Sequence, residues 1–184
     1  MQWLTYANIL KGISGFGASN GYALDMGSIY YLKRIALPSN MCVAINLTWI
    51  DISTFATSWK DSYPKTFGTG YSTGVLQMYG VKIGGLFTFN PLPKMYIDGF
   101  INMHPTYSLI DVSLDSKRYY NADPLFLDGV SMRYNFGANF RYSLLLVGAD
   151  FDFGSTQNSG NTTYSSNFKS NFFRLRIGVM FNRG

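Results

Sequence analysis

The chain has 184 residues, a formal net charge of +5, 17% aromatic residues and only 14% charged residues. This length suits a single domain over residues 1–184. The charged fraction is well below the roughly 25% of soluble globular proteins, and so many rings exclude a disordered chain. The longest unbroken apolar run covers residues 41–45, far short of the about 20 residues of a spanning helix, which excludes a helical membrane bundle.

The composition does not favour binding of a metal, a cofactor or a nucleic acid. The one cysteine, Cys42, cannot form an internal disulfide, and the one histidine, His104, excludes a histidine-rich metal site. We therefore predict no metal and no cofactor. Lys and Arg residues are scattered along the sequence, so no nucleic-acid partner is expected. The first residues lack the basic start and the cleavage site of a signal peptide, and we expect that one has been removed.

Apolar residues at every second position predict β-strands along the chain. The first strand is expected near Trp3–Ile13, before a break at Gly15–Asn20. The apolar or small faces of later strands are formed by Tyr22, Leu24, Met26, Tyr30 and Leu32; Met41, Val43, Ile45, Leu47 and Trp49; Val75, Tyr79, Val81 and Ile83; Met95, Ile97, Gly99, Ile101 and Met103; Val130, Met132, Tyr134 and Phe136; and Phe173, Leu175, Ile177, Val179 and Phe181. The opposite faces are mostly charged, small or polar.

Short and long breaks alternate between these segments. Turn-like residues predict short connections at Leu37–Asn40, Asn90–Lys94 and Ala138–Arg141. Polar or irregular stretches predict long connections at roughly 57–73, 105–128 and 154–170. The pattern gives about eight strands in up-and-down order, with both termini at the end of the short turns.

Two architectures use eight alternating strands, and they differ in which face points inward. A soluble barrel of the lipocalin kind buries its apolar face, whereas a membrane barrel turns that face to lipid and keeps a polar interior. The polar faces here carry charges of both signs, which suits a narrow lumen where opposite walls meet: Asp25, Lys82, Asp98, Arg133, Asp150, Asp152, Arg174 and Arg176. This favours an all-β fold, an eight-stranded antiparallel up-and-down transmembrane β-barrel, with the soluble barrel as the alternative.

The last strand carries the most specific family feature. The segment Arg176–Phe181 has a polar residue, a glycine (Gly178), alternating hydrophobic residues and a final aromatic, Phe181. It is similar to the C-terminal assembly signal of small Gram-negative outer-membrane barrels, and the whole pattern of strands and connections resembles the OmpA transmembrane domain and OmpX. The resemblance implies a location in the bacterial outer membrane, in contact with outer-membrane lipid and lipopolysaccharide.

For the residues that could act in catalysis or bind a metal, a structural role explains the sequence better. His104 and Ser108 could act as base and nucleophile, but a third group must orient them, and Asp98 lies about 20 Å away along an extended strand. Asp150 and Asp152 could bind Ca²⁺, but two carboxylates are too few ligands. The last hairpin would instead pair them with Arg174 or Arg176. We therefore predict no catalytic residues and no enzyme.

The long connections remain as the place for recognition. They hold rings beside cations, which suits protein, glycan or phosphate contacts: Trp59, Tyr63, Phe67 and Tyr71 in one, and Arg118, Tyr119 and Tyr120 in another. We predict a structural or interaction protein, or an accessory subunit that contacts other envelope proteins. The alternatives are a small-solute channel, a lipid-modifying envelope enzyme and a soluble binder.

Overall fold

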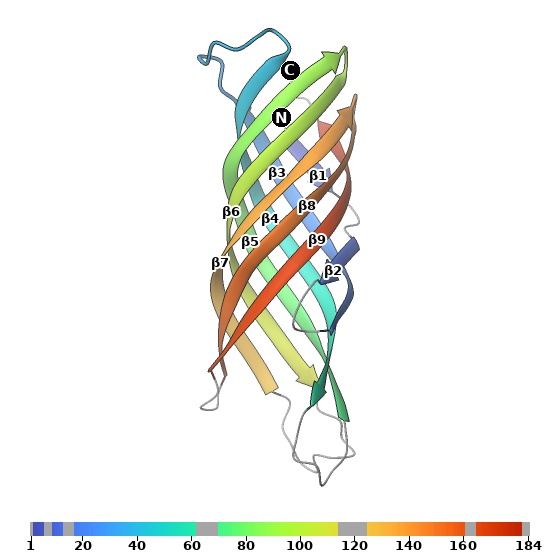
Figure 1. The fold of residues 1–184 in the computed structure, drawn as a ribbon, viewed down its shortest axis with the longest axis vertical. Coiled ribbons are helices and arrows are strands. Elements are labelled where there is room, and N and C mark those ends of the chain that lie inside the picture. The colour runs from blue at the N-terminus through green and yellow to red at the C-terminus, as the bar shows by residue number, and fades with distance from the viewer. Residues whose placement is uncertain are drawn as a thin grey trace.

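A computed structural model describes residues 2–5, 9–12, 17–61, 70–113, 125–160 and 165–181. Every long element in these ranges is a β-strand (Figure 1). In the described residues no helix is long and apolar enough to cross a membrane.

Neighbouring strands in the chain pair with each other in antiparallel, up-and-down order. The strands are β1 (Gln2–Thr5), β2 (Ile9–Gly12), β3 (Gly17–Tyr31), β4 (Met41–Asp61), β5 (Gly70–Leu92), β6 (Met95–Ser113), β7 (Leu125–Tyr142), β8 (Leu145–Gly160) and β9 (Ser165–Phe181). From β3 to β9 each strand pairs with the next. The strands are strongly tilted and curl into a tall barrel (Figure 1).

The two short N-terminal strands close the sheet. β1 pairs with β3 and with β9, so Gln2 lies between Ser28 and Phe181. β2 also pairs with both strands, and Leu10 lies between Gly21 and Arg174. The last strand therefore meets the first residues of the chain, and β1 and β2 bridge parts of the β3 and β9 edges. Both termini lie at the end of the barrel that carries the short connections (Figure 1), as the sequence predicted.

The strands extend farther than the sequence pattern indicated. β4 continues to Asp61, β6 runs through Pro105 to Ser113, and β8 continues to Gly160, so the predicted long connections were drawn too wide. Polar residues can occupy these strands because antiparallel pairing satisfies the hydrogen bonds of the backbone N–H and C=O groups with any side chain.

The predicted turn at Ala138–Arg141 was wrong. β7 continues to Tyr142, and the chain reverses at Ser143 and Leu144, where Ser143 has a positive φ of 56°. A two-residue hairpin needs such a left-handed residue. The sequence signal was misleading because Ala138 and Asn139 resemble turn residues, although both pair with β6 and β8.

The two faces of the sheet have opposite chemistry, with the apolar face outward. Val130 is 71% exposed and Ile177 is 59% exposed, whereas Arg133 and Arg174 on the same two strands are buried. This is the reverse of a soluble barrel, in which the large aliphatic side chains would fill the centre.

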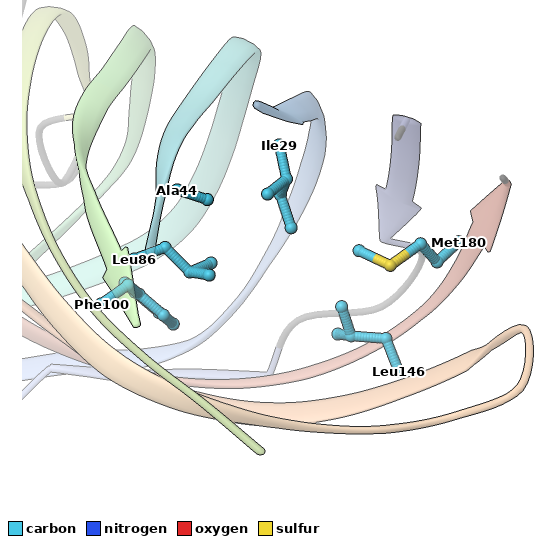
Figure 2. Packing of buried hydrophobic residues seen from close by; sticks show 6 residues of the cluster. All are labelled: Ile29, Ala44, Leu86, Phe100, Leu146 and Met180. Carbon is cyan, nitrogen blue, oxygen red and sulfur yellow. The ribbon is translucent and has the colours of Figure 1, made fainter. Parts of the chain in front are cut away.

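Two apolar layers cross the interior. The turn-side layer consists of Ile29, Ala44, Leu86, Phe100, Leu146 and Met180, whose side chains point inward from six strands (Figure 2). The loop-side layer consists of Ala23, Phe55, Met78 and Phe172, with the rings of Phe55 and Phe172 stacked 4.3 Å apart. Along β5 the charged Lys82 lies between Met78 and Leu86, so a polar layer separates the two apolar ones.

Candidate functional site

All eight residues that the sequence assigned to a charged lumen are buried in the interior: Asp25, Lys82, Asp98, Arg133, Asp150, Asp152, Arg174 and Arg176. The structure brings seven of them together in one group, which also contains Asp51 and His104. We call these nine residues the central network. The eighth, Asp98, lies apart, nearer the short turns, where it contacts Arg141.

Arg174 is the hub of the central network. Its Nη1 lies 3.0 Å from Asp51 Oδ2 and 3.6 Å from Asp25 Oδ1. Its Nε lies 3.1 Å from Asp150 Oδ1, and its Nη2 lies 3.1 Å from Asp152 Oδ2. One guanidinium thus contacts four carboxylates from three strands, which the fork of five N–H donors makes possible.

Each of these four carboxylates also contacts a second cation. Lys82 contacts Asp51, and its Nζ lies 3.5 Å from Asp25 Oδ2. Arg176 contacts Asp150. Arg133 Nε donates to Asp152 Oδ1 at 2.5 Å. The four Asp and four Lys or Arg residues of the central network have formal charges that sum to zero when His104 is neutral, so the cost of desolvation is offset by pairing.

Side-chain amides extend the central network across the barrel. Asn46 Nδ2 donates to Asn102 Oδ1, and Asn102 Nδ2 donates to Asn135 Oδ1, both at 3.2 Å. Asn135 Nδ2 then donates to Asp150 Oδ1 at 2.5 Å. In this chain of amides the Asn46–Asn102 bond joins β4 and β6, which are not neighbours in the sheet, whereas Asn102 and Asn135 lie on the paired strands β6 and β7.

Asp51 is a central residue that sequence reasoning missed, because a β-bulge changes which face it occupies. Strict alternation from Met41 to Trp49 would place Asp51 outside. The pairing with β5 shifts between Thr48 and Asp51, and both Trp49 and Ile50 point outward. The extra residue returns Asp51 to the interior, where it is 2% exposed. A bulge inserts one such residue and leaves only a weak sequence signal.

His104 lies between two carboxylates that come from other strands. Its Nδ1 lies 2.5 Å from Asp152 Oδ2 on β8, and its Nε2 lies 3.3 Å from Asp51 Oδ2 on β4. From the sequence we considered only Asp98 on the same strand, whereas these two partners come from strands on either side of β6. Ser108 lies four residues farther along β6, about 13 Å at strand spacing, and donates instead to the Gly129 carbonyl oxygen at 3.3 Å.

The carboxylates of the central network form ion pairs with Lys and Arg side chains. Asp150 and Asp152, which could have suggested a Ca²⁺ site, contact Arg133, Arg174 and Arg176. Among the residues that the structure describes, no group of three or more His, Cys, Asp or Glu side chains is placed to hold a metal ion.

Asp98 and Arg141 form a separate ion pair, the turn-end pair. Arg141 Nε and Nη2 donate to the two oxygens of Asp98 at 2.5 and 2.6 Å. Thr88 Oγ1 donates to Asp98 Oδ1 at 2.6 Å, and Arg141 Nη2 donates to the Tyr31 hydroxyl at 3.0 Å. The Arg141 guanidinium also stacks 4.7 Å from the Tyr96 ring centroid. Sequence reasoning missed Arg141 because it assigned the residue to a turn.

Cation–π contacts connect the charges to the apolar layers. The Arg133 guanidinium lies 4.8 Å from the Phe172 ring centroid in the loop-side layer, and that of Arg176 lies 5.0 Å from the Phe100 ring centroid in the turn-side layer. Such contacts stabilise a desolvated cation because the face of an aromatic ring is electronegative. Arg133 and Arg176 therefore pack against one ring in each of the two apolar layers.

Two glycines make room for the central network. A Cβ at Gly80 would lie 2.6 Å from His104 Nε2, and a Cβ at Gly137 would lie 2.6 Å from Asp150 Cβ. Larger side chains at these wall positions would push the buried groups from their places. The many small residues on the polar faces are thus explained by close approach in a narrow interior.

The other predicted site residues are placed only in part. Trp59 and Tyr71 lie on the paired ends of β4 and β5, but their side chains are outside the described part of the structure, as are Tyr63, Phe67, Arg118, Tyr119 and Tyr120. Gly178 is buried on β9 and pairs with Thr5 and Leu146. Phe181 is 54% exposed at the end of β9.

Comparisons with known proteins give likenesses of structure alone. No family model matches the chain, and no curated protein sequence matches it. Solved structures similar to it include Ail of Yersinia pestis in complex with the heparin analogue sucrose octasulfate, at 13% identity and a TM-score of 0.44 over 98% of this chain and 96% of that one. Neisserial surface protein A has 12% identity and a TM-score of 0.48 over 97% and 94%. The outer membrane protease OmpT of Escherichia coli has 11% identity and a TM-score of 0.45 over 87% and 62%.

These three solved structures are outer-membrane β-barrel proteins. The present chain forms a barrel through its own strand pairing.

Proposed function

We propose that this protein is an integral barrel of the bacterial outer membrane with a lumen closed by side chains, and that it acts as a structural or interaction protein. In this proposal β1 and β2 are two parts of one interrupted strand, which makes eight strands in all. The observation that carries the proposal is the inversion of the two faces, with an ion-paired interior inside an apolar outer surface.

The outer surface suits the hydrocarbon of a bilayer. Ile101 and Ile177 are 64% and 59% exposed at positions that face away from the central network. Exposed apolar area on this scale marks a contact surface on any protein, and here it surrounds the barrel. Tyr142 and Phe181 are exposed at strand ends near the short turns, where aromatic residues favour the membrane–water boundary.

The interior suits a plug better than a pore. Eight strands leave a centre just wide enough to be filled by side chains. The successive layers here are apolar, ionic, apolar and ionic, from the loop-side layer to the turn-end pair. A channel would need a continuous polar path through both apolar layers, which contain Phe55, Phe100 and Phe172.

Recognition is then expected at the connections opposite the short turns. Membrane barrels carry their longer loops on the extracellular side, and the sequence of these connections combines rings with Lys and Arg. The expected partners are outer-membrane lipid, lipopolysaccharide and other envelope proteins. An enzymatic role is not proposed, because the buried His104 is committed to two carboxylates and Ser108 lies far along the strand.

Membrane partitioning tests this proposal. The protein should require detergent or lipid to stay folded, should incorporate into phosphatidylcholine vesicles, and should migrate differently on a detergent gel before and after boiling. A folded, monodisperse protein in buffer without detergent would overturn the proposal and favour the soluble barrel.

A further inference from the structure

Among the residues that the structure describes at the short-turn end of the barrel, the exposed charged side chains are all cations. Three connections and the strand ends next to them form this surface, which we call the turn-end rim: residues 32–40, 90–94 and 142–145. Lys33, Arg34 and Lys94 are exposed there, and the sequence of the rim contains neither Asp nor Glu. The acid that follows soonest along the chain, Asp98, is buried and bound to Arg141. The rim is therefore a positively charged surface.

Apolar side chains are exposed beside these cations. Ile35 follows Arg34 directly, Leu92 lies two residues before Lys94, and Leu144 lies in the neighbouring hairpin; all three are exposed. Lysine and arginine next to exposed aliphatic residues suit the boundary between acyl chains and headgroups, where the apolar groups enter hydrocarbon and the cations meet phosphate. A polar protein partner would leave the aliphatic residues without a suitable contact.

Backbone hydrogen bonds connect the rim into a continuous structure. The Asn90 amide donates to the Asn40 carbonyl at 2.7 Å, and the Ser143 amide donates to the Lys94 carbonyl at 2.9 Å. The Met180 amide donates to the Leu144 carbonyl at 2.8 Å. These bonds fix the backbone of the two connections that carry the cations. Binding of a ligand therefore costs less backbone conformational entropy.

We propose that the turn-end rim binds the anionic headgroups of phospholipids in the adjacent leaflet, through Lys33, Arg34 and Lys94. This inference rests on the proposed membrane function, and it adds a lipid class and a site. Short turns of such barrels face the periplasm, so the leaflet in question is the inner one. Each basic residue near an anionic surface favours association by about fivefold.

The test counts lipids bound to wild type and to a charge-removed variant. Lys33→Gln, Arg34→Gln and Lys94→Asn are combined, with Asn at position 94 because the φ of 65° there is left-handed, which Asn tolerates. Both proteins are folded into phosphatidylcholine vesicles with a minor fraction of phosphatidylglycerol and analysed by native mass spectrometry. We expect the ratio of retained phosphatidylglycerol to phosphatidylcholine to fall by about fivefold or more in the variant.

A matched control removes three charges near the opposite connections, with Lys60→Gln, Lys65→Gln and Lys117→Gln. This control should retain phosphatidylglycerol as wild type does. Equal retention by wild type and the rim variant overturns the inference, and so does an equal loss in both triple variants, since net charge alone would then explain it. Displacement of the lipid by inorganic phosphate also overturns it in favour of a free-phosphate site, whereas unchanged retention supports it.

The same experiment separates this inference from the proposed function. The shift in gel mobility on boiling reports whether the protein has folded into the vesicles. If wild type fails to fold into these vesicles, the proposed membrane function is overturned, and so is the inference that rests on it. If wild type folds and its lipid ratio equals that of the rim variant, the inference alone is overturned.

Discussion

The central network and the turn-end pair solve the same physical problem in different ways. Both hold charges inside a closed barrel. In the central network Arg174 contacts four carboxylates, and each of these carboxylates has a second cation. In the turn-end pair the described contacts give Asp98 one cation, Arg141, in a bidentate arrangement. The central network is redundant and the turn-end pair is not.

This difference implies that loss of one cation is tolerated better in the centre. Burying a charge without a partner costs far more than weakening a shared interaction. Four predictions test the comparison, in order of decreasing effect.

Removing Arg141 should have the largest effect on stability. Arg141→Met leaves the Asp98 carboxylate buried beside Thr88 without its cation, and this should lower the free energy of unfolding by about 3–5 kcal/mol. The double variant Asp98→Asn/Arg141→Met should recover most of that loss, because no uncompensated charge remains. Reversible urea unfolding in lipid vesicles measures both. A double variant as unstable as the single one would show that the charge is not the cause.

A charge on the outer face should be the next most damaging change. Ile177→Arg places a guanidinium against lipid and should cost about 2–4 kcal/mol near the bilayer midplane. Arg176→Gln, one residue away on the inner face, should cost less, because Asp150 keeps its contacts with Arg174 and Asn135. Folding yield in vesicles compares the two. Equal tolerance at the two positions would contradict the assignment of the faces.

Removing the hub of the central network should be milder than removing Arg141. Arg174→Met should cost about 1.5–3 kcal/mol, the range for hydrogen bonds to charged groups, since Lys82, Arg133 and Arg176 still contact the four carboxylates. The same unfolding assay applies. A loss equal to or greater than that of Arg141→Met would show that the redundancy does not protect the central network.

Changes at the long connections should leave the barrel stable and alter only recognition. Trimming residues 62–69 and 114–124 should abolish co-purification with an envelope partner or surface glycolipid, because hot-spot rings contribute about 2 kcal/mol or more each. His104→Ala should leave capture of that partner nearly unchanged. Pull-downs from native membranes compare the variants, and identical partners for intact and trimmed protein would contradict the interaction role.

The sequence predicted the regular parts of the strands and missed the positions where the pattern is interrupted. Alternation identified the faces of most strands, including Arg174 and Arg176 inside and Ile177 outside, because a two-residue period follows directly from strand geometry. It missed Asp51, because a bulge breaks the period, and Arg141, because turn-like residues occur inside β7. Contacts such as that of His104 on β6 with Asp152 on β8 join strands two apart and depend on the curvature of the sheet, which no local pattern encodes.

Conductance in planar bilayers tests the central claim most directly, since a barrel filled by two apolar layers and two sets of ion pairs should not conduct. Wild-type protein, shown to be folded by its gel mobility, should give no large and steady ohmic current. As a positive control, Phe100→Ala combined with Phe172→Ala should open the interior and produce measurable current. Steady current of porin size through the wild-type protein would contradict the plugged lumen and favour the channel.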